Sequence, residues 1–265
     1  MLRTRILSAA VFAPALFGII WTGGIALQMA CLILSLAMVW EFFRMLPLEL
    51  SGLAQAGTYG ATALTVAGVY GWLPPELSTV LAPLVTLLLI LVSLVRVESM
   101  ADGLPKMAAL FLAVAYCGGM IPYLAALREV DLGYALGALF CTWAGDTGAY
   151  FAGRALGKNK LAPTISPKKT IEGAVGGLIA AVLVGFLVRG WLMPTASATV
   201  AVAMGLLAGG LGVVGDLAES LLKRSCDVKD SSNLIPGHGG VLDRFDGVMF
   251  AAPAIYIYVV LVQGG

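Results

Sequence analysis

Long apolar stretches, separated by short polar turns, follow one another along almost the whole chain of 265 residues. A helix needs about 20 mostly apolar residues to cross a hydrocarbon core of about 30 Å. Nine stretches approach or meet this length, so the pattern predicts about nine transmembrane helices. Their approximate ranges are 7–22, 25–46, 58–73, 79–95, 107–126, 132–151, 172–193, 197–215 and 247–263.

The composition supports a membrane location for most of the surface. Hydrophobic residues make up 60% of the chain and charged residues only 12%, whereas about a quarter of a soluble domain is charged. So few charges cannot cover a water-facing surface. The expected fold class is therefore an all-α, polytopic integral membrane protein.

The distribution of Lys and Arg predicts the orientation. Cytoplasmic loops carry an excess of these residues, and Arg3 and Arg5 place the N-terminus in the cytoplasm. With nine alternating helices, fourteen of the sixteen Lys and Arg lie inside, Arg96 among them, and only Arg128 and Arg189 lie outside. The prediction is a multi-pass protein of the cell inner (cytoplasmic) membrane with its C-terminus outside. The net charge of +1 argues against nucleic acid as a partner.

A first polar block begins inside an apolar stretch and continues into a loop. Asp146 lies within a predicted helix, where a charge is costly and indicates a functional site. Arg154 follows two helical turns later, so both can face one side, either in a site or as a structural ion pair. The loop then reads Ser-Pro-Lys-Lys-Thr at 166–170, with Lys168 and Lys169 suited to phosphate oxygens. Read alone, such a run is equally typical of an ordinary cytoplasmic loop.

A second polar block places carboxylates at the mouth of the last two helices. Asp216, Glu219, Ser220 and Lys223 follow each other at helical spacings of three and four, so they form one polar stripe. Asp243 and Asp246, like the Asp216 of the stripe, offer oxygen ligands near phosphate-binding cations. This is the combination that Mg²⁺ uses, and the number of cations stays open.

Two further polar residues are candidates for a role at the site. His238 is the only histidine, and a lone histidine is more often structural than a metal ligand. Its place before Gly239 and Gly240 predicts a backbone close to a ligand, with the ring as a phosphate donor. Glu41 precedes the interfacial anchor Arg44 at a helix end and can have a further role.

These residues resemble the signature of the phosphatidate cytidylyltransferases, or CDP-diacylglycerol synthases. That signature has Ser, then Lys-Arg, Lys-Asp, a Pro-x-His-Gly-Gly element and Asp-Arg-x-Asp. The chain carries it without gaps at Ser220, Lys223-Arg224, Lys229-Asp230, Pro236-Gly-His238-Gly239-Gly240 and Asp243-Arg244-Phe-Asp246. The first block is similar to the family's Asp-x-x-Ala-Tyr-x-x-Gly-Arg and Ser-Pro-Lys-Lys-Thr-x-Glu-Gly elements, whereas residues 1–130 resemble the family only loosely.

The resemblance implies a nucleotidyltransferase that moves CMP from CTP to phosphatidate and releases pyrophosphate. Its implied metal ligands are Asp216, Asp243 and Asp246, with Asp146 as a fourth. Its implied catalytic residues are Asp216, Lys223, Arg224 and Arg244. Its implied substrate-binding residues are Arg154, Lys168, Lys169, Ser220, Lys229, His238, Gly239 and Gly240.

The resemblance also implies an arrangement of the chain in the membrane. One transmembrane domain covers 1–265, with N-terminal helices in 1–130 and the catalytic helices and cytoplasmic loops in 131–265. CTP would reach a polar cavity from the cytoplasm, and phosphatidate would enter sideways from the lipid. A homodimer is implied too, although the Gly-x-x-x-Gly runs at 173–177 and 205–209 permit close packing within one chain as well.

Three other functions remain as alternatives. A CTP-dependent lipid-alcohol kinase would transfer the γ-phosphoryl group and need a base for a hydroxyl. A CDP-alcohol phosphotransferase would need a spaced Asp-Gly-x-x-Ala-Arg motif, which the sequence lacks. A transporter would place its charges at mid-bilayer, often in repeated halves.

Overall fold

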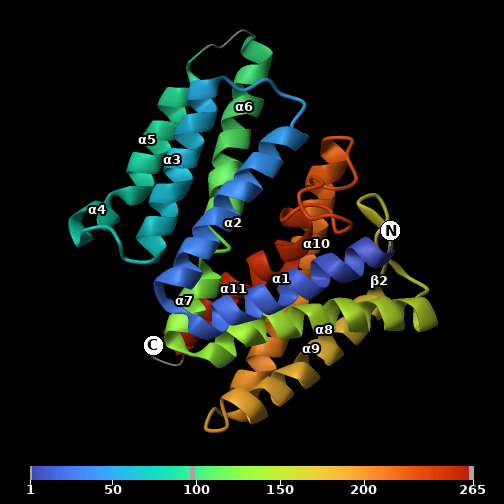
Figure 1. The fold of residues 1–265 in the computed structure, drawn as a ribbon. Helices are drawn as coiled ribbons and strands as arrows, with labels where there is room; N and C mark the ends of the chain where they lie inside the picture. Colours follow the sequence, from blue (N-terminus) through green and yellow to red (C-terminus); the bar gives the residue numbers. More distant parts are fainter. Residues whose placement is uncertain (1, 96–98, 263–265) are drawn as a thin grey trace.

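The chain folds almost entirely into helices (Figure 1). The computed structural model describes residues 2–95 and 99–262, with side chains described for Ser8 and from residue 10 onward. The first helices are α1 (Leu2–Thr22), α2 (Gly24–Met45), α3 (Gly52–Val69), the short α4 (Pro75–Thr79), α5 (Leu81–Ser93) and α6 (Met100–Leu112). After them come a π-helical segment η1 (Ala113–Gly118), α7 (Tyr123–Val130), α8 (Leu132–Leu156), α9 (Ile171–Leu192), α10 (Ala198–Ser225) and α11 (Leu242–Val262).

Within residues 2–95 and 99–262, five helical segments are long and apolar enough to cross a membrane. They are α2, the continuous stretch Met100–Val130, α9, α10 and α11. The expectation of an all-α, multi-pass membrane protein is therefore confirmed, while the count of nine crossings stays a prediction. Arg96 and residues 263–265, which that topology also used, lie outside the described residues, as do the side chains of Arg3 and Arg5.

Among the helices that carry the polar candidates, three extend beyond the apolar stretches that predicted them. The stretch ending at 215 continues to Ser225 in α10, the one ending at 151 continues to Leu156 in α8, and the last helix begins at Leu242 rather than 247. Apolarity marks only the part of a helix that faces lipid, whereas the backbone hydrogen bonds continue past it. Most of the polar candidates therefore lie on rigid helix ends rather than in loops.

A small hairpin replaces part of the loop expected after α8. Strands β1 (Lys160–Ala162) and β2 (Ser166–Thr170) pair antiparallel, with Lys160 opposite Thr170. Thr170 caps α9, because its hydroxyl accepts a hydrogen bond from the Gly173 amide at 3.1 Å. The Glu172 carboxylate accepts from the Lys158 amide at 3.1 Å, which ties the approach to the hairpin to the start of α9.

Small residues allow α8, α9 and α10 to approach closely. A Cβ on Gly177 of α9 would lie 2.6 Å from the Gly145 carbonyl oxygen of α8, and one on Gly185 would lie 2.5 Å from the Ala201 carbonyl oxygen of α10. Gly205 is equally crowded by the backbone of Val182. The Gly-x-x-x-Gly runs therefore serve packing inside this chain.

Figure 1 shows how the helices are grouped. Helices α3, α5 and α6 stand side by side, and α2 runs between them and the remainder. Helix α1 lies along α8, and α11 ends near α7. The hairpin and the adjoining ends of α8 and α10 thus lie at one end of the bundle, where the polar residues gather.

Candidate active site

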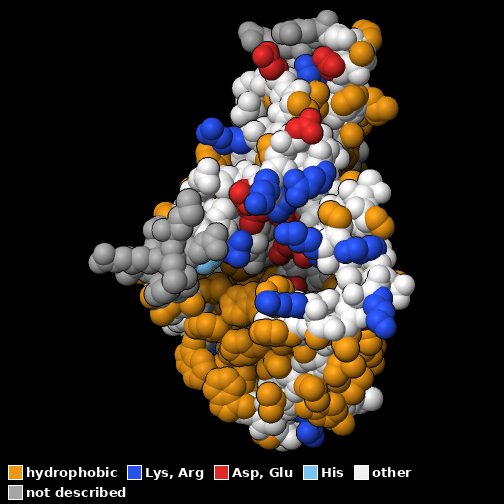
Figure 2. Space-filling model, turned by 90° about the vertical axis from the view of Figure 1, so that its right-hand side faces the viewer, with side chains coloured by type: hydrophobic (Ala, Val, Ile, Leu, Met, Phe, Trp, Pro, Cys, Tyr) orange, Lys and Arg blue, Asp and Glu red, His pale blue; other side chains and the backbone are white. Residues whose placement is uncertain are grey.

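The two polar blocks of the sequence meet at one cavity. An ion pair joins them, with Lys169 Nζ of β2 2.5 Å from Asp216 Oδ2 of α10. The cavity measures about 370 Å³ and lies between α8, the hairpin, α9 and α10, with Asp146, Arg154 and Lys168 also in its wall. Figure 2 shows Lys and Arg side chains around a hollow in which acidic side chains lie deeper.

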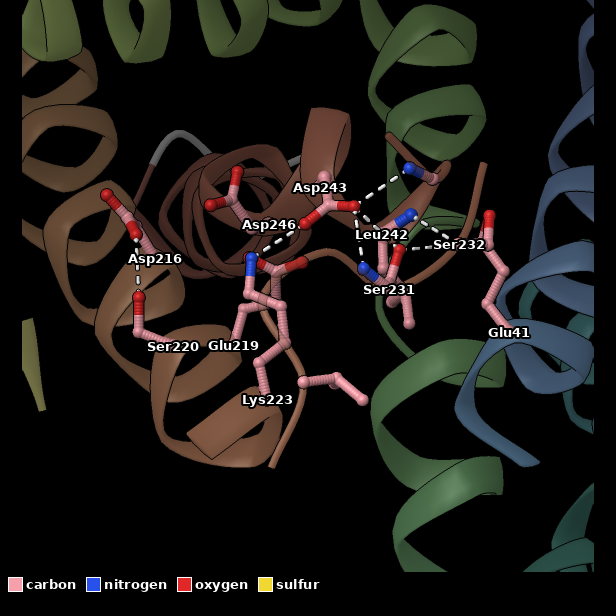
Figure 3. Close-up of polar contacts among 12 residues, drawn as sticks. Glu41, Asp216, Glu219, Ser220, Lys223, Ser231, Ser232, Leu242, Asp243 and Asp246 are labelled. Atoms are coloured by element: carbon pink, nitrogen blue, oxygen red, sulfur yellow. Dashed lines mark hydrogen bonds and ion pairs between the residues drawn. The ribbon is translucent and has the colours of Figure 1, made fainter. Parts of the chain in front are cut away.

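The predicted polar stripe on α10 is present. Ser220 Oγ donates to Asp216 Oδ1 at 3.3 Å, and Lys223 Nζ donates to Glu219 Oε2 at 2.6 Å. Lys223 also reaches Asp243 Oδ1 on α11 at 2.6 Å (Figure 3). Its ammonium group therefore bridges the two helices, and its expected contact with a substrate phosphate stays a prediction.

The Asp243 carboxylate has many hydrogen-bond donors. Besides Lys223, it accepts from the Ser231 amide at 2.9 Å, the Ser231 hydroxyl at 2.8 Å and the Gly240 amide at 2.8 Å. All four are donors from the chain itself, so a cation would have to compete with them for this carboxylate. Asp243 as a metal ligand stays a prediction.

Asp246 lies one helical turn further along α11, between Asp216 and Asp243 (Figure 3). Its Oδ1 accepts only from the neighbouring Gly247 amide, at 2.8 Å, among the hydrogen bonds of the described residues. Its carboxylate interacts electrostatically with those of Asp216 and Asp146. Neighbouring carboxylates repel each other, and a bound cation would relieve this repulsion.

The acidic group suits Mg²⁺ better than a metal that needs a full protein cage. Within the part of the chain that the structure describes, no three His, Cys, Asp or Glu side chains are arranged to hold a metal by themselves. Mg²⁺ typically takes one or two carboxylates and completes its shell with water and substrate phosphates. Asp216 and Asp246 fit this donor set, and Asp146 lines the same cavity as Asp216.

Several cations of the two polar blocks are exposed, and two of them, Arg154 and Lys168, line the cavity. Arg154, Lys168, Arg224, Lys229 and Arg244 all have exposed side chains. Arg154 donates to the Tyr150 hydroxyl at 3.2 Å, and in the described residues it forms no ion pair with Asp146. The two side chains, Asp146 and Arg154, therefore do not form the structural ion pair that was the alternative to a role in a site.

The histidine and its glycines have internal partners. His238 Nδ1 lies 2.8 Å from Ser8 Oγ, which connects this loop to α1. Gly239 has φ of +83°, and a Cβ there would lie 2.7 Å from Asp243 Oδ2. A Cβ on Gly240 would lie 2.5 Å from Glu41 Oε1. These glycines allow the backbone to approach two carboxylates of the chain itself, those of Asp243 and Glu41. Contact of this segment with substrate stays a prediction.

Two residues at the site had no assigned role in the sequence. Glu41 of α2 is fully buried and accepts hydrogen bonds from the loop before α11, and Ser231 lies between it and Asp243. A carboxylate inside an apolar helix was a signal for Glu41. Ser231 gave no signal, because a serine in a polar loop is ordinary.

Comparison with known proteins agrees with this geometry. The model of the cytidylyltransferase family matches residues 3–262. A protein of Staphylococcus haemolyticus (strain JCSC1435) is 34% identical over 258 residues, 97% of each chain, and one of Staphylococcus aureus (strain COL) is 32% identical over the same length and share. A protein of Bacillus subtilis (strain 168) is 41% identical over 153 residues, 57% of each chain.

All three relatives are named phosphatidate cytidylyltransferase. The family match covers the N-terminal helices as well as the two polar blocks, although the sequence of residues 1–130 had shown only a loose likeness. The motifs and the similarity over nearly the whole chain therefore indicate the same family. The chain belongs to the cytidylyltransferase family.

Proposed function

We propose that this protein is a phosphatidate cytidylyltransferase, which converts CTP and phosphatidate into CDP-diacylglycerol and pyrophosphate. The observation that carries the proposal is the junction of the two polar blocks through Lys169 and Asp216. It brings an acidic group and a set of exposed cations to one cavity at the end of an apolar helical bundle. The names of the relatives supply the substrates.

The acidic group would hold the divalent cation. Asp216 and Asp246 are the proposed ligands, with Asp146 in the same cavity as Asp216. To bind the cation, Asp216 would have to release Lys169, and Asp243 would have to release its several donors. A bound Mg²⁺ would neutralise charge on the CTP phosphates and on the departing pyrophosphate. The number of bound cations is left open.

The cations would hold the phosphates of both substrates. Arg154, Lys168 and Lys169 line the cavity, and Lys168 and Arg154 are exposed to it without an acidic partner among the described residues. Arg224 and Arg244 lie exposed at the ends of α10 and α11 and would contact phosphates from that side. Ser220, on the Asp216 face of α10, would donate a hydrogen bond.

The reaction needs little proton transfer. An oxygen of the phosphatidate phosphate, already anionic at neutral pH, would form a bond to the α-phosphorus of CTP. The bond from that phosphorus to the bridging oxygen would break, and pyrophosphate would leave with the electron pair. The residues of the chain would act mainly by orienting two anions and stabilising the charge that develops between them.

The distribution of Lys and Arg along the sequence supports the proposed arrangement in the membrane. The cavity would open to the cytoplasm, in line with the charge distribution, and phosphatidate would keep its acyl chains in the bilayer. The N-terminus would be cytoplasmic and the C-terminus outside. A homodimer is retained as a prediction, which no contact described here requires.

Two labels in CTP distinguish this activity from the kinase alternative. Purified protein with phosphatidate and CTP labelled at the α-phosphate should produce labelled lipid, and γ-label should appear in pyrophosphate. A kinase would instead place γ-label in a lipid alcohol and release CDP. Label transfer of the second kind, with no CDP-lipid formed, would refute the proposed function.

A further inference from the structure

Glu41 is a carboxylate of α2 that none of the proposed chemistry uses. Its side chain is fully buried, although it is charged and lies in a mostly apolar helix. It accepts four hydrogen bonds, from the segment between α10 and α11 and from the first residue of α11 (Figure 3). Oε1 accepts from the Ser232 hydroxyl at 2.6 Å and the Val241 amide at 2.8 Å, and Oε2 from the Ser231 hydroxyl at 3.2 Å and the Leu242 amide at 2.8 Å.

Two of these donors belong to the start of α11. The first amides of a helix have no partner inside it, and a negative charge there is favourable because of the helix dipole. Glu41 meets both requirements for Val241 and Leu242, from a helix about 200 positions earlier in the chain. It therefore fixes where α11 begins, one residue before Asp243 and four before Asp246.

The contact continues to the acidic group. The Ser231 hydroxyl lies 3.2 Å from Glu41 Oε2 and 2.8 Å from Asp243 Oδ2. Asp243 in turn holds Lys223, and Lys223 holds Glu219. This series links α2 to α11 and α10 by charge-assisted hydrogen bonds, which are about twice as strong as neutral ones. We propose that Glu41 is a positioning residue, which holds the first turn of α11 and Asp243 in the geometry that the reaction needs.

The expected effect of Glu41 on the reaction rests on the proposed function, whereas its expected anchoring of α11 does not. The substitution Glu41→Gln keeps the size of the side chain but replaces one acceptor oxygen by an NH₂ donor. Either orientation of the amide would set that donor against a backbone N–H, of Val241 or of Leu242, and a backbone N–H cannot become an acceptor. Glu49→Gln is the matched control, because Glu49 follows α2 and is exposed.

Hydrogen exchange in detergent, without substrates, tests the anchoring directly. In Glu41→Gln, peptides covering 231–242 should exchange faster, while those covering the hairpin at 160–170 should keep the wild-type rate. Glu49→Gln should match wild-type throughout. An unchanged rate at 231–242, or an equal rise along the whole chain, would overturn the proposal whatever the enzyme's activity is.

Kinetics test the consequence for the reaction. Glu41→Gln should lower kcat by about 10- to 100-fold, the size expected when groups are displaced by about 1 Å, with a far smaller change in KM for CTP. If Glu41 acts through Ser231, the double variant with Ser231→Ala should be little worse than Glu41→Gln alone. Wild-type kcat in Glu41→Gln, or effects that add fully, would contradict the positioning role. A wild-type protein that forms no CDP-diacylglycerol would refute the proposed function instead.

Discussion

Removing the ammonium group of Lys223 should destabilise the protein, apart from any effect on the reaction. Lys223 Nζ lies 2.6 Å from Glu219 Oε2 and 2.6 Å from Asp243 Oδ1, and these two side chains are only 2% and 6% exposed. In Lys223→Met, Glu219 would be left without a cation, and its second oxygen is already buried without a partner among the described residues. Such an uncompensated buried charge costs about 3–5 kcal/mol.

The Asp243 side of the bridge reduces that figure. Asp243 keeps the donors from Ser231 and Gly240, so most of the loss falls on Glu219. We therefore expect the lower end, about 3 kcal/mol. At roughly 2–4 °C per kcal/mol for a chain somewhat smaller than this one, the melting temperature should fall by roughly 6–12 °C.

Thermal unfolding of purified protein in one detergent measures this effect. Lys158→Met is the matched control, because Lys158 is exposed on the same end of the bundle, and it should melt within about 2 °C of wild-type. The double variant Lys223→Met with Glu219→Gln should recover part of the loss, because the stranded charge is removed as well. A Lys223→Met protein that melts like the control would refute the bridging role.

Two further predictions concern the metal and the topology. Asp246→Asn should raise the Mg²⁺ concentration for half-maximal activity and lower turnover at saturation, while the melting temperature stays near wild-type, and a normal Mg²⁺ response would remove Asp246 from the metal site. In intact cells an impermeant thiol reagent should label Thr195→Cys, between α9 and α10, but not Ser166→Cys in the hairpin, and the reverse pattern would invert the orientation. Native background should be low, because Cys31, Cys117 and Cys141 are buried, and partial burial beside Asp227 raises the pKa of the Cys226 thiol.

The sequence was sufficient to predict the membrane fold and the charged residues that line the cavity. Hydrophobic stretches depend on local composition, so they could be read directly, and the stripe of Asp216, Ser220 and Lys223 follows from helical spacing alone. Helix ends could not be read in the same way. The polar first turn of α11 looked like a loop, because the apolar criterion fails where a helix leaves the lipid.

The pairing of particular side chains across the fold could not be predicted. Lys169 was expected to guide a phosphate, and the structure pairs it with Asp216, 47 positions later in the printed sequence. Asp243 and Asp246 were grouped as metal ligands, but a step of three residues separates two side chains by about 60° around a helix and by about 4.5 Å along it, so their neighbours can differ. Asp243 faces Ser231 and Lys223, whereas Asp246 lies toward Asp216.

The glycines before α11 show why a motif can be recognised before its physical cause is known. Gly239 and Gly240 suggested a backbone near a bound phosphate, yet an added Cβ on either would meet a carboxylate of the chain itself, that of Asp243 or Glu41. Both carboxylates accept hydrogen bonds from amides of this same segment. The segment must therefore lack side chains where it wraps around them, because a Cβ would push the amides away from their acceptors. The same glycines can admit a phosphate only from the side that these two carboxylates leave open.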